Sequence, residues 1–302
     1  MEDIQKPVPL ENEVLVKVHA VAVNPLDWHI MRGAPYFARV SVGLFKPKFH
    51  VLGADISGVV ESTGKNLSRF KPGDGVLGNV FSSGLGGLAE YVCTAEKNLV
   101  SKPVNISFAE AAAVPVAALT ALTALRDTGK VQSGQHVLVN GSSGGVGTYT
   151  VQLAKYYGAH VTGVCSTGNL ELVRSIGADE VIDYTTGHIR QNRTKYDLLI
   201  DNVGNLSVKD MVSLMTPFGL AAVVGFTKMS LMLQVSIMGG RRIKLVNVKA
   251  TQDDMIFLKD LLEAEKIKPV IDRMYSLADT PKAIEYLEKG HAKGKVVINV
   301  SH

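Results

Sequence analysis

The first residues whose types and spacing suggest chemistry form a glycine-rich turn after a short apolar run, His136–Asn140. Helical spacing of apolar residues follows the turn, so it joins a predicted strand to a predicted helix. Because Gly144 and Gly145 lack side chains, a pyrophosphate can approach the backbone N–H groups at the helix start, where the helix dipole favours negative charge. Gly147 lets this helix lie close to the strand. The pattern predicts a dinucleotide site formed by Ser142, Gly144, Gly145, Val146 and Gly147.

The residues after the second predicted strand favour NADPH over NADH. Folds that bind NAD usually place an Asp or Glu on the adenosine ribose, about 20 residues after the glycines. Here Ser166, Thr167 and Asn169 occupy that place, and no acid occurs before Glu171. Their hydroxyl and amide groups can donate to a 2′-phosphate, which a carboxylate would repel. Arg174 is close enough in sequence to add positive charge, or it is simply a solvated helix residue.

The same turn also contains a competing pattern, Gly141-x-Ser143-x-Gly145, which is typical of the nucleophile turn of serine hydrolases. Three histidines follow in the chain order that a catalytic triad requires: His188, His291 and His302. However, a hydrolase sheet begins well before its nucleophile strand, whereas the preceding region here predicts a separate β module. Such a hydrolase also has no need of Gly147. Catalysis by Ser143 is therefore the minor alternative.

The elements that must position these residues alternate between strand and helix after about residue 109. Six apolar runs predict strands: His136–Asn140, His160–Cys165, Glu180–Asp183 and residues 198–203, 220–226 and 243–248. Helices are predicted at residues 109–128, 146–157 and 170–176. This alternation predicts an α/β fold with a doubly wound, six-stranded parallel sheet, which binds its cofactor at the carboxyl ends of the strands. The strand ends add four candidate cofactor residues: Asn202, Val203, Gly225 and Phe226.

The chain before and after this region predicts a second domain. Short alternating runs interrupted by Gly and Pro indicate a mostly β module, with strands at residues 13–21, 56–60 and 88–92. The tail predicts helices at residues 254–264 and 281–289 and a last strand at 295–300. That strand can pair with the N-terminal module, which would make the module discontinuous. We therefore predict two domains, residues 1–115 with 249–302, and residues 116–248.

Composition and charge exclude several classes of function. Net charge is +4, from 32 basic and 28 acidic residues, and the two signs are interspersed, which argues against a nucleic-acid partner. Two cysteines, Cys93 and Cys165, cannot form a disulfide framework, and reduced thiols suit a cytoplasmic protein. The acidic start predicts no signal peptide. The longest uncharged stretches fall short of the roughly 18–20 apolar residues that span a membrane, so no span is predicted.

A metal site is not predicted. Zinc sites place Cys and His at close spacing. His19 and His29 are ten residues apart with no cysteine beside them, and His50 has no neighbouring ligand. We therefore expect no zinc.

Several motifs together resemble the medium-chain dehydrogenase/reductase superfamily, in its zinc-free quinone oxidoreductase (zeta-crystallin-like) branch. They include Asn24-Pro25-x-Asp27, the stretch 53–60 without the His-Glu pair of zinc alcohol dehydrogenases, the segment 135–159, and the segment 290–295. The resemblance covers nearly the whole chain. The family normally begins some two dozen residues earlier, so the resemblance implies either that a first strand of the β module is missing here or that the start of the sequence is misassigned.

The resemblance implies a GroES-like β catalytic domain beside a Rossmann domain. It further implies NADPH-dependent reduction, without zinc, of a small-molecule quinone, enone or alkenal, and a homodimer. A non-catalytic protein of the same family that only binds nucleotide is the alternative, because intact glycines do not distinguish the two.

By family position, Asn24, Asp27 and Thr120 should lie near the nicotinamide as catalytic residues. Each has a structural alternative: turn chemistry for Asn24, a helix cap for Asp27 and packing for Thr120. We also expect Tyr184 and Lys295 to contact the cofactor.

Overall fold

The computed structural model of the 302-residue chain describes residues 2–33, 43, 48–187, 189, 193–225 and 229–300. Two compact units account for the chain. Unit 1 comprises Met1–Val116, Ala250–Glu265 and Pro269–His302. Unit 2 comprises Ala117–Lys249 and Lys266–Lys268. The short segment Lys266–Lys268 is assigned to unit 2, although it lies within the range predicted for the β domain.

Unit 1 is built on a sheet that, in the described part of the chain, has seven strands in the order β12-β13-β1-β2-β3-β5, with β4 also paired to β1. The strands are β1 (Glu13–Val23), β2 (Asp55–Thr63), β3 (Gly75–Asn79), β4 (Tyr91–Ala95), β5 (Leu99–Ser101), β12 (Ile271–Ser276) and β13 (Lys295–Asn299). As the sequence predicts, the last strand pairs with the N-terminal module, since β13 runs antiparallel to β1.

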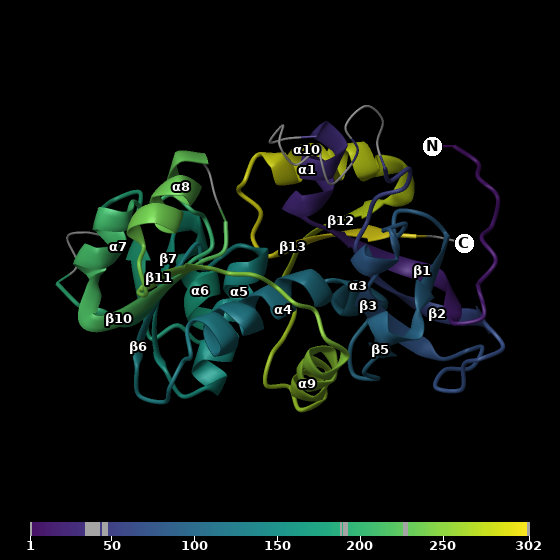
Figure 1. Cartoon of the computed structure of the whole chain (residues 1–302), viewed down its shortest axis with the longest axis horizontal. Coiled ribbons are helices and arrows are strands. Elements are labelled where there is room, and N and C mark those ends of the chain that lie inside the picture. Colours follow the sequence, from purple (N-terminus) through teal and green to yellow (C-terminus); the bar gives the residue numbers. More distant parts are fainter. Residues whose placement is uncertain are drawn as a thin grey trace. The chain divides into compact units, whose positions relative to one another are not determined.

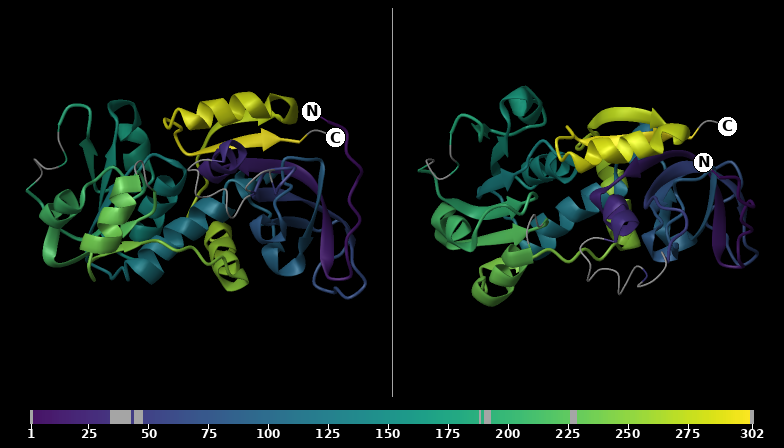
Figure 2. Two further views of the ribbon diagram at one scale, coloured as in Figure 1. Left: turned by 45° about the horizontal axis from the view of Figure 1, so that its top comes forward. Right: turned by 90° about the horizontal axis from the view of Figure 1, so that it is seen from above.

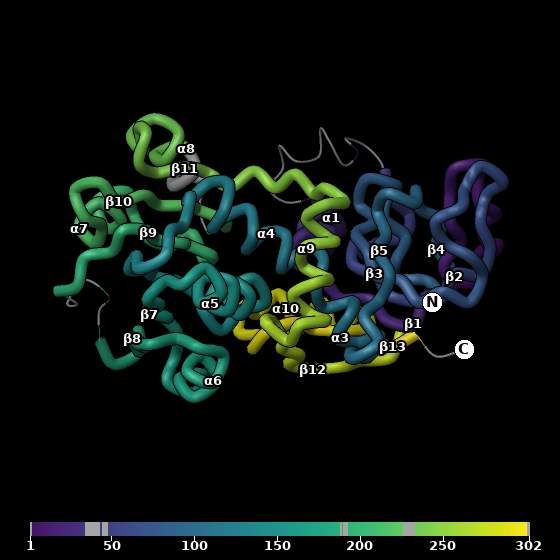
Figure 3. Tube along the Cα trace, turned by 90° about the horizontal axis from the view of Figure 1, so that it is seen from below, coloured from purple at the N-terminus to yellow at the C-terminus, as the bar shows by residue number. Residues whose placement is uncertain are grey.

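Among the described residues, four helices lie wholly within unit 1: α1 (Pro25–Arg32), α3 (Phe108–Ala112), α9 (Gln252–Glu263) and α10 (Thr280–Glu288). Figure 2 shows α10 lying along β12 and β13, and α9 packs against β5 (Figure 3). The core behind the sheet is dominated by β-branched residues of the strands, such as Val16, Ile56 and Ile298, all fully buried. Short 3₁₀ turns occur at Phe81–Ser83, Glu96–Asn98 and Leu277–Asp279.

Unit 2 has a six-stranded, all-parallel sheet in the order β11-β10-β9-β6-β7-β8, which confirms the predicted doubly wound fold. Its strands are β6 (His136–Asn140), β7 (His160–Cys165), β8 (Glu180–Asp183), β9 (Tyr196–Asp201), β10 (Met215–Val223) and β11 (Ile243–Leu245). Its helices are α5 (Gly145–Tyr156), α6 (Leu170–Ser175), α7 (Val208–Leu214) and α8 (Met229–Met238). Figures 1 and 3 show α5 and α6 on one face of the sheet and α7 and α8 on the other.

Several predicted elements differ from the structure. The single helix expected at residues 109–128 is divided into α3, α4 (Pro115–Leu122) and a π-helical turn, Thr123–Thr128. Pro115 explains the first break, because a proline lacks the N–H that would continue α3. The strand expected at 88–92 lies at β4 instead, and β11 ends before the expected residue 248. None of the helices in the described residues combines the length and apolar character needed to span a bilayer.

Candidate functional site

The turn between β6 and α5 is held against the neighbouring strand β7. The backbone N–H and the hydroxyl of Ser142 both donate to the carbonyl of Val164, each at 3.0 Å, so the Ser142 side chain is buried beneath the turn. A Cβ on Gly147 would lie 2.0 Å from the carbonyl oxygen of Gly141, which explains why α5 needs glycine here. A Cβ on Gly144 would meet only that same oxygen, at 3.6 Å. The start of α5 is therefore open to a ligand.

A second turn, after β9, is organised by a buried carboxylate that sequence reasoning missed. Asp201 accepts the side-chain amide of Asn140 at 2.7 Å and the backbone N–H groups of Val203 and Gly204 at 3.2 and 2.9 Å. Burial raises the pKa of Asp201, and these donors act in the opposite direction. An acidic residue directly after an apolar strand was the only available signal. Asp201 therefore fixes the backbone that follows Asn202.

Asn202 carries an unsatisfied polar side chain. Both its amide oxygen and its amide nitrogen are buried and have no hydrogen-bond partner within the described residues. Gly225, which follows β10, is required beside it, because a Cβ there would lie 2.8 Å from the Asn202 carbonyl oxygen. A buried unpaired polar group costs about 1–3 kcal/mol unless a ligand or water satisfies it. This amide fits the polar groups of a dinucleotide. Val203 is partly exposed on the same turn, and the predicted Phe226 lies outside the described residues.

The turn after β7 brings together the residues predicted to recognise a 2′-phosphate. The Asn169 amide nitrogen donates to the hydroxyls of Ser143 and Ser166, at 3.0 and 3.2 Å, and its amide oxygen is a further buried atom with no partner in the described chain. The Thr167 hydroxyl donates to Asp183 at 2.6 Å. An acid is therefore present after all, at the end of β8.

Asp183 was missed because it is remote in sequence but adjacent in the sheet, where it lies opposite Cys165. Hydroxyls of Thr167 and Thr185 donate to its carboxylate and hold its pKa below the usual range, so it is ionised at neutral pH. Arg174 on α6 and Tyr184 after β8 are exposed at this end of the sheet.

The contacts of Ser143 do not support the alternative hypothesis of a serine hydrolase. Its hydroxyl accepts the Asn169 amide, as described above, and it is 8% exposed. Of the predicted triad histidines, His188 and His302 lie outside the described residues, and His291 belongs to unit 1. All six strands of the unit 2 sheet begin at or after β6, unlike a hydrolase sheet, which starts earlier in the chain.

In unit 1, the predicted catalytic residue Asp27 has a structural role at the start of α1. Its two oxygens accept the backbone N–H groups of Asn24 and Gly53, at 2.7 and 3.0 Å. The side chain is fully buried. Burial raises the pKa of Asp27 to about 6, although the two backbone donors oppose the shift.

Asn24 and Lys295 belong to the same buried cluster, together with Asp55. The Lys295 ammonium donates to the Asn24 amide oxygen at 2.6 Å and to Asp55 at 3.2 Å. The Asn24 amide nitrogen donates to Asp55 at 3.0 Å and to the carbonyl of Ala22 at 3.2 Å, so both of its hydrogens are engaged. Asp55 also accepts the Val116 backbone N–H at 2.9 Å. Burial raises the pKa of Asp55, and the positive charge of Lys295 lowers it.

The structure thus brings together three predicted residues, Asn24, Asp27 and Lys295, in unit 1. Thr120 is buried on the part of α4 that belongs to unit 2. Across the described residues, no group of three or more His, Cys, Asp or Glu side chains is arranged to hold a metal ion.

Comparison with known proteins identifies the family to which this fold and these motifs belong. Residues 10–104 match the alcohol dehydrogenase GroES-like domain, and residues 176–298 match a family described as zinc-binding dehydrogenase. The chain belongs to the medium-chain dehydrogenase/reductase superfamily, in its quinone oxidoreductase-like branch.

Two curated relatives and one solved structure illustrate the similarity. The chain is 33% identical to the mitochondrial NAD(P)H oxidoreductase RTN4IP1 of Mus musculus, over 96% of this chain and 82% of that protein. It is 37% identical to the 2-methylene-furan-3-one reductase of Solanum lycopersicum, over 96% of this chain and 72% of that protein. The quinone oxidoreductase of Coxiella burnetii superposes with a TM-score of 0.90 at 30% identity, over 99% of this chain and 94% of that one.

Proposed function

We propose that this chain is an NADPH-dependent reductase of quinones or of activated carbon–carbon double bonds in enones and alkenals. The observation that carries the proposal is the buried, unpartnered amide of Asn202, at the same sheet edge as the open glycine turn at Gly144. The names of the relatives, which include an NAD(P)H oxidoreductase, a quinone oxidoreductase and a 2-methylene-furan-3-one reductase, support the same chemistry.

The residues at this edge of the sheet bind different parts of the cofactor. The N–H groups at the start of α5 bind the pyrophosphate, because Gly144 leaves room for it and Gly147 holds the helix close to β6. Asn202 binds polar groups of the cofactor with its amide. When bound, NADPH supplies a hydride to the acceptor.

The chain's own groups must then orient the acceptor and polarise its oxygen, because no zinc is expected to do so. Thr120 is the candidate donor. Asn24 is better described as a positioning residue, since both of its amide hydrogens are engaged by Asp55 and Ala22.

The preference for NADPH over NADH depends on the balance between groups that attract a 2′-phosphate and one that repels it. Ser166 and Arg174 favour a 2′-phosphate, whereas the ionised Asp183, bound to Thr167, opposes it. We expect fluorescence titration to give tighter binding of NADPH than of NADH. Asp183→Asn should increase the ratio of the two affinities by about tenfold, as expected for removing one charge near the phosphate. Tighter binding of NADH by the unaltered protein would contradict the proposed cofactor.

Turnover distinguishes a reductase from a protein that only binds nucleotide. Oxidation of NADPH should be followed with a quinone, an alkenal and a simple alcohol, and Asn202→Ala should bind the cofactor about tenfold or more weakly. Lys209→Met, an exposed change on α7, serves as the control and should behave like the unaltered protein. Binding of NADPH without reduction of any acceptor would favour the non-catalytic alternative.

A homodimer and a cytoplasmic location stay predictions.

A further inference from the structure

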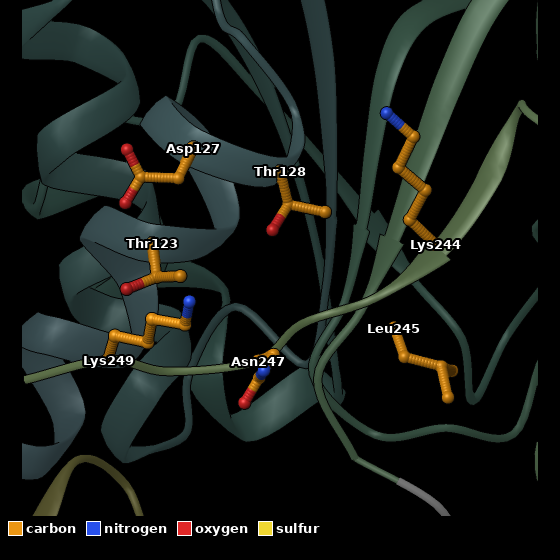
Figure 4. Close-up of a pocket in the computed structure, with 7 residues that line it drawn as sticks. All are labelled: Thr123, Asp127, Thr128, Lys244, Leu245, Asn247 and Lys249. Carbon is orange, nitrogen blue, oxygen red and sulfur yellow. The ribbon is translucent and has the colours of Figure 1, made fainter.

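A hollow lies in unit 2, and its lining residues lie outside the turns of the dinucleotide site. Its volume is about 390 Å³, and it is bounded by the π-helical turn Thr123–Thr128 and by the chain at residues 244–249 (Figure 4). None of its lining residues belongs to the glycine-rich turn or to the turns after β7 and β9. The volume falls within the range of small-molecule sites, about 300–1,000 Å³.

The hollow has a positive charge that the protein does not neutralise. Lys244 and Lys249 line it, and neither side-chain ammonium has a hydrogen-bond or ion-pair partner in the part of the chain that the structure describes. The acid among the lining residues, Asp127, is already bound by the guanidinium of Arg126, with two contacts of 2.7 and 2.8 Å. Asp127 therefore does little to cancel the field of the two lysines.

Two neutral hydrogen-bond donors also line the hollow. Thr128 contributes a hydroxyl and Asn247 contributes an amide. In Figure 4 the Lys244 and Lys249 side chains stand on opposite sides of Thr128. Two cations separated by neutral donors match a ligand that carries an acid group at each end, since each carboxylate gains a charge-assisted hydrogen bond.

The backbone beside the hollow is unusual. The Gly129 N–H donates to the carbonyl of Ala124, five residues earlier, at 2.9 Å, as in a π-helix. Turns of this kind are rare and occur frequently at functional sites. This one places Thr123, Asp127 and Thr128 along the wall of the hollow.

We propose that this hollow binds a small organic diacid, for which succinate is the probe, at a site separate from the dinucleotide site. The site does not depend on the proposed reductase activity, because all of its contacts belong to the π-helical turn and the chain at residues 244–249.

Calorimetric titration of the full chain with succinate at low ionic strength tests the proposal. Succinate should bind, and butyrate, which has the same chain length and one acid group, should bind about tenfold or more weakly. Lys244→Met and Lys249→Met should each weaken succinate binding by a similar factor, whereas the exposed control Lys209→Met should leave it unchanged. The absence of succinate binding, or equal binding by the two pocket variants and the control, would overturn the proposal.

A second titration separates this site from the dinucleotide site. NADPH should bind to Lys244→Met and Lys249→Met with its ordinary affinity, and saturating NADPH should leave succinate binding in place. Competition between NADPH and succinate would show that they share one site and would also overturn the proposal. Failure of NADPH binding in the unaltered chain would count against the proposed reductase alone.

Discussion

Replacing Lys295 by methionine tests whether the buried cluster of unit 1 depends on its single cation. Lys295 is 4% exposed and Asp55 is fully buried, and their charged atoms are 3.2 Å apart. Lys295→Met leaves the Asp55 carboxylate without its cation and the Asn24 amide oxygen without its donor. Removing one partner of a buried ion pair costs about 3–5 kcal/mol, so we expect a loss of that size in the free energy of unfolding.

The chain's single tryptophan makes this measurement specific to unit 1. Trp28 lies on α1, directly after Asp27, so its fluorescence during urea unfolding reports the unit that contains the cluster. The matched control is Lys282→Met, which breaks the ion pair between Lys282 and Asp279. The Lys282 side chain is 74% exposed. That change should cost less than about 1 kcal/mol.

A double-mutant cycle with Asp55→Asn separates the pair from general damage. Because Asp55→Asn removes the charge that Lys295 compensates, the two changes together should cost at least about 2 kcal/mol less than the sum of the single costs. The cost of Lys295→Met should also shrink as the pH falls, since protonation of Asp55 removes the uncompensated charge. Additive costs, or a loss below about 1 kcal/mol for Lys295→Met, would refute the reasoning.

Three further results are expected. Burial raises the pKa of Asp27 from 3.8 to about 6, so the folded chain retains a proton that the unfolded chain releases. Raising the pH from 4 to 6 should therefore lower the free energy of unfolding of unit 1 by about 2 kcal/mol, and Asp27→Asn should lack this slope in urea unfolding. Gly147→Ala should abolish NADPH binding in fluorescence titrations, because its Cβ would lie 2.0 Å from the Gly141 carbonyl oxygen. In Gly144→Ala the Cβ would meet only that oxygen, at 3.6 Å, so this variant should still fold and lose only affinity for NADPH. Dialysis against a strong chelator should leave reductase activity intact, and restoration of a lost activity by zinc would show that the expected absence of metal is wrong.

The parts of the fold predicted best from sequence are short apolar strands with turns at both ends. β6, β7 and β8 were predicted with the bounds that the structure has. For β6 and β7 the reason is burial on both faces of a parallel sheet, which favours mostly apolar runs. By contrast, β12 (Ile271–Ser276) was missed. Its side chains are mostly exposed or half-buried, so no apolar pattern marks it. It forms because β13 offers it a parallel partner.

The candidate site was predictable where local chain geometry determines it and not where distant segments meet. The requirement for Gly147 follows from the strand-turn-helix pattern alone. The contact of Thr167 with Asp183 depends on the order of strands, and that of Asn24 with Lys295 spans 271 residues. No local pattern encodes either contact, which is why Asp183 was not noticed beside the predicted phosphate site and why the contact of Lys295 with Asn24 was not predicted.

The position of β13 in the sheet has a consequence for how the protein is made. β13 lies between β1 and β12, and it covers residues 20–23 of β1. During synthesis, which proceeds from the N-terminus, the strands of unit 2 emerge together and can pair while that edge of β1 is still open. The edge closes, and Asp55 acquires its cation, only when residues 295–299 leave the ribosome. A chain that stops short of this strand exposes both an unpaired edge and an unneutralised acid, so the N-terminal module becomes protease-resistant only after residues 295–299 have been made.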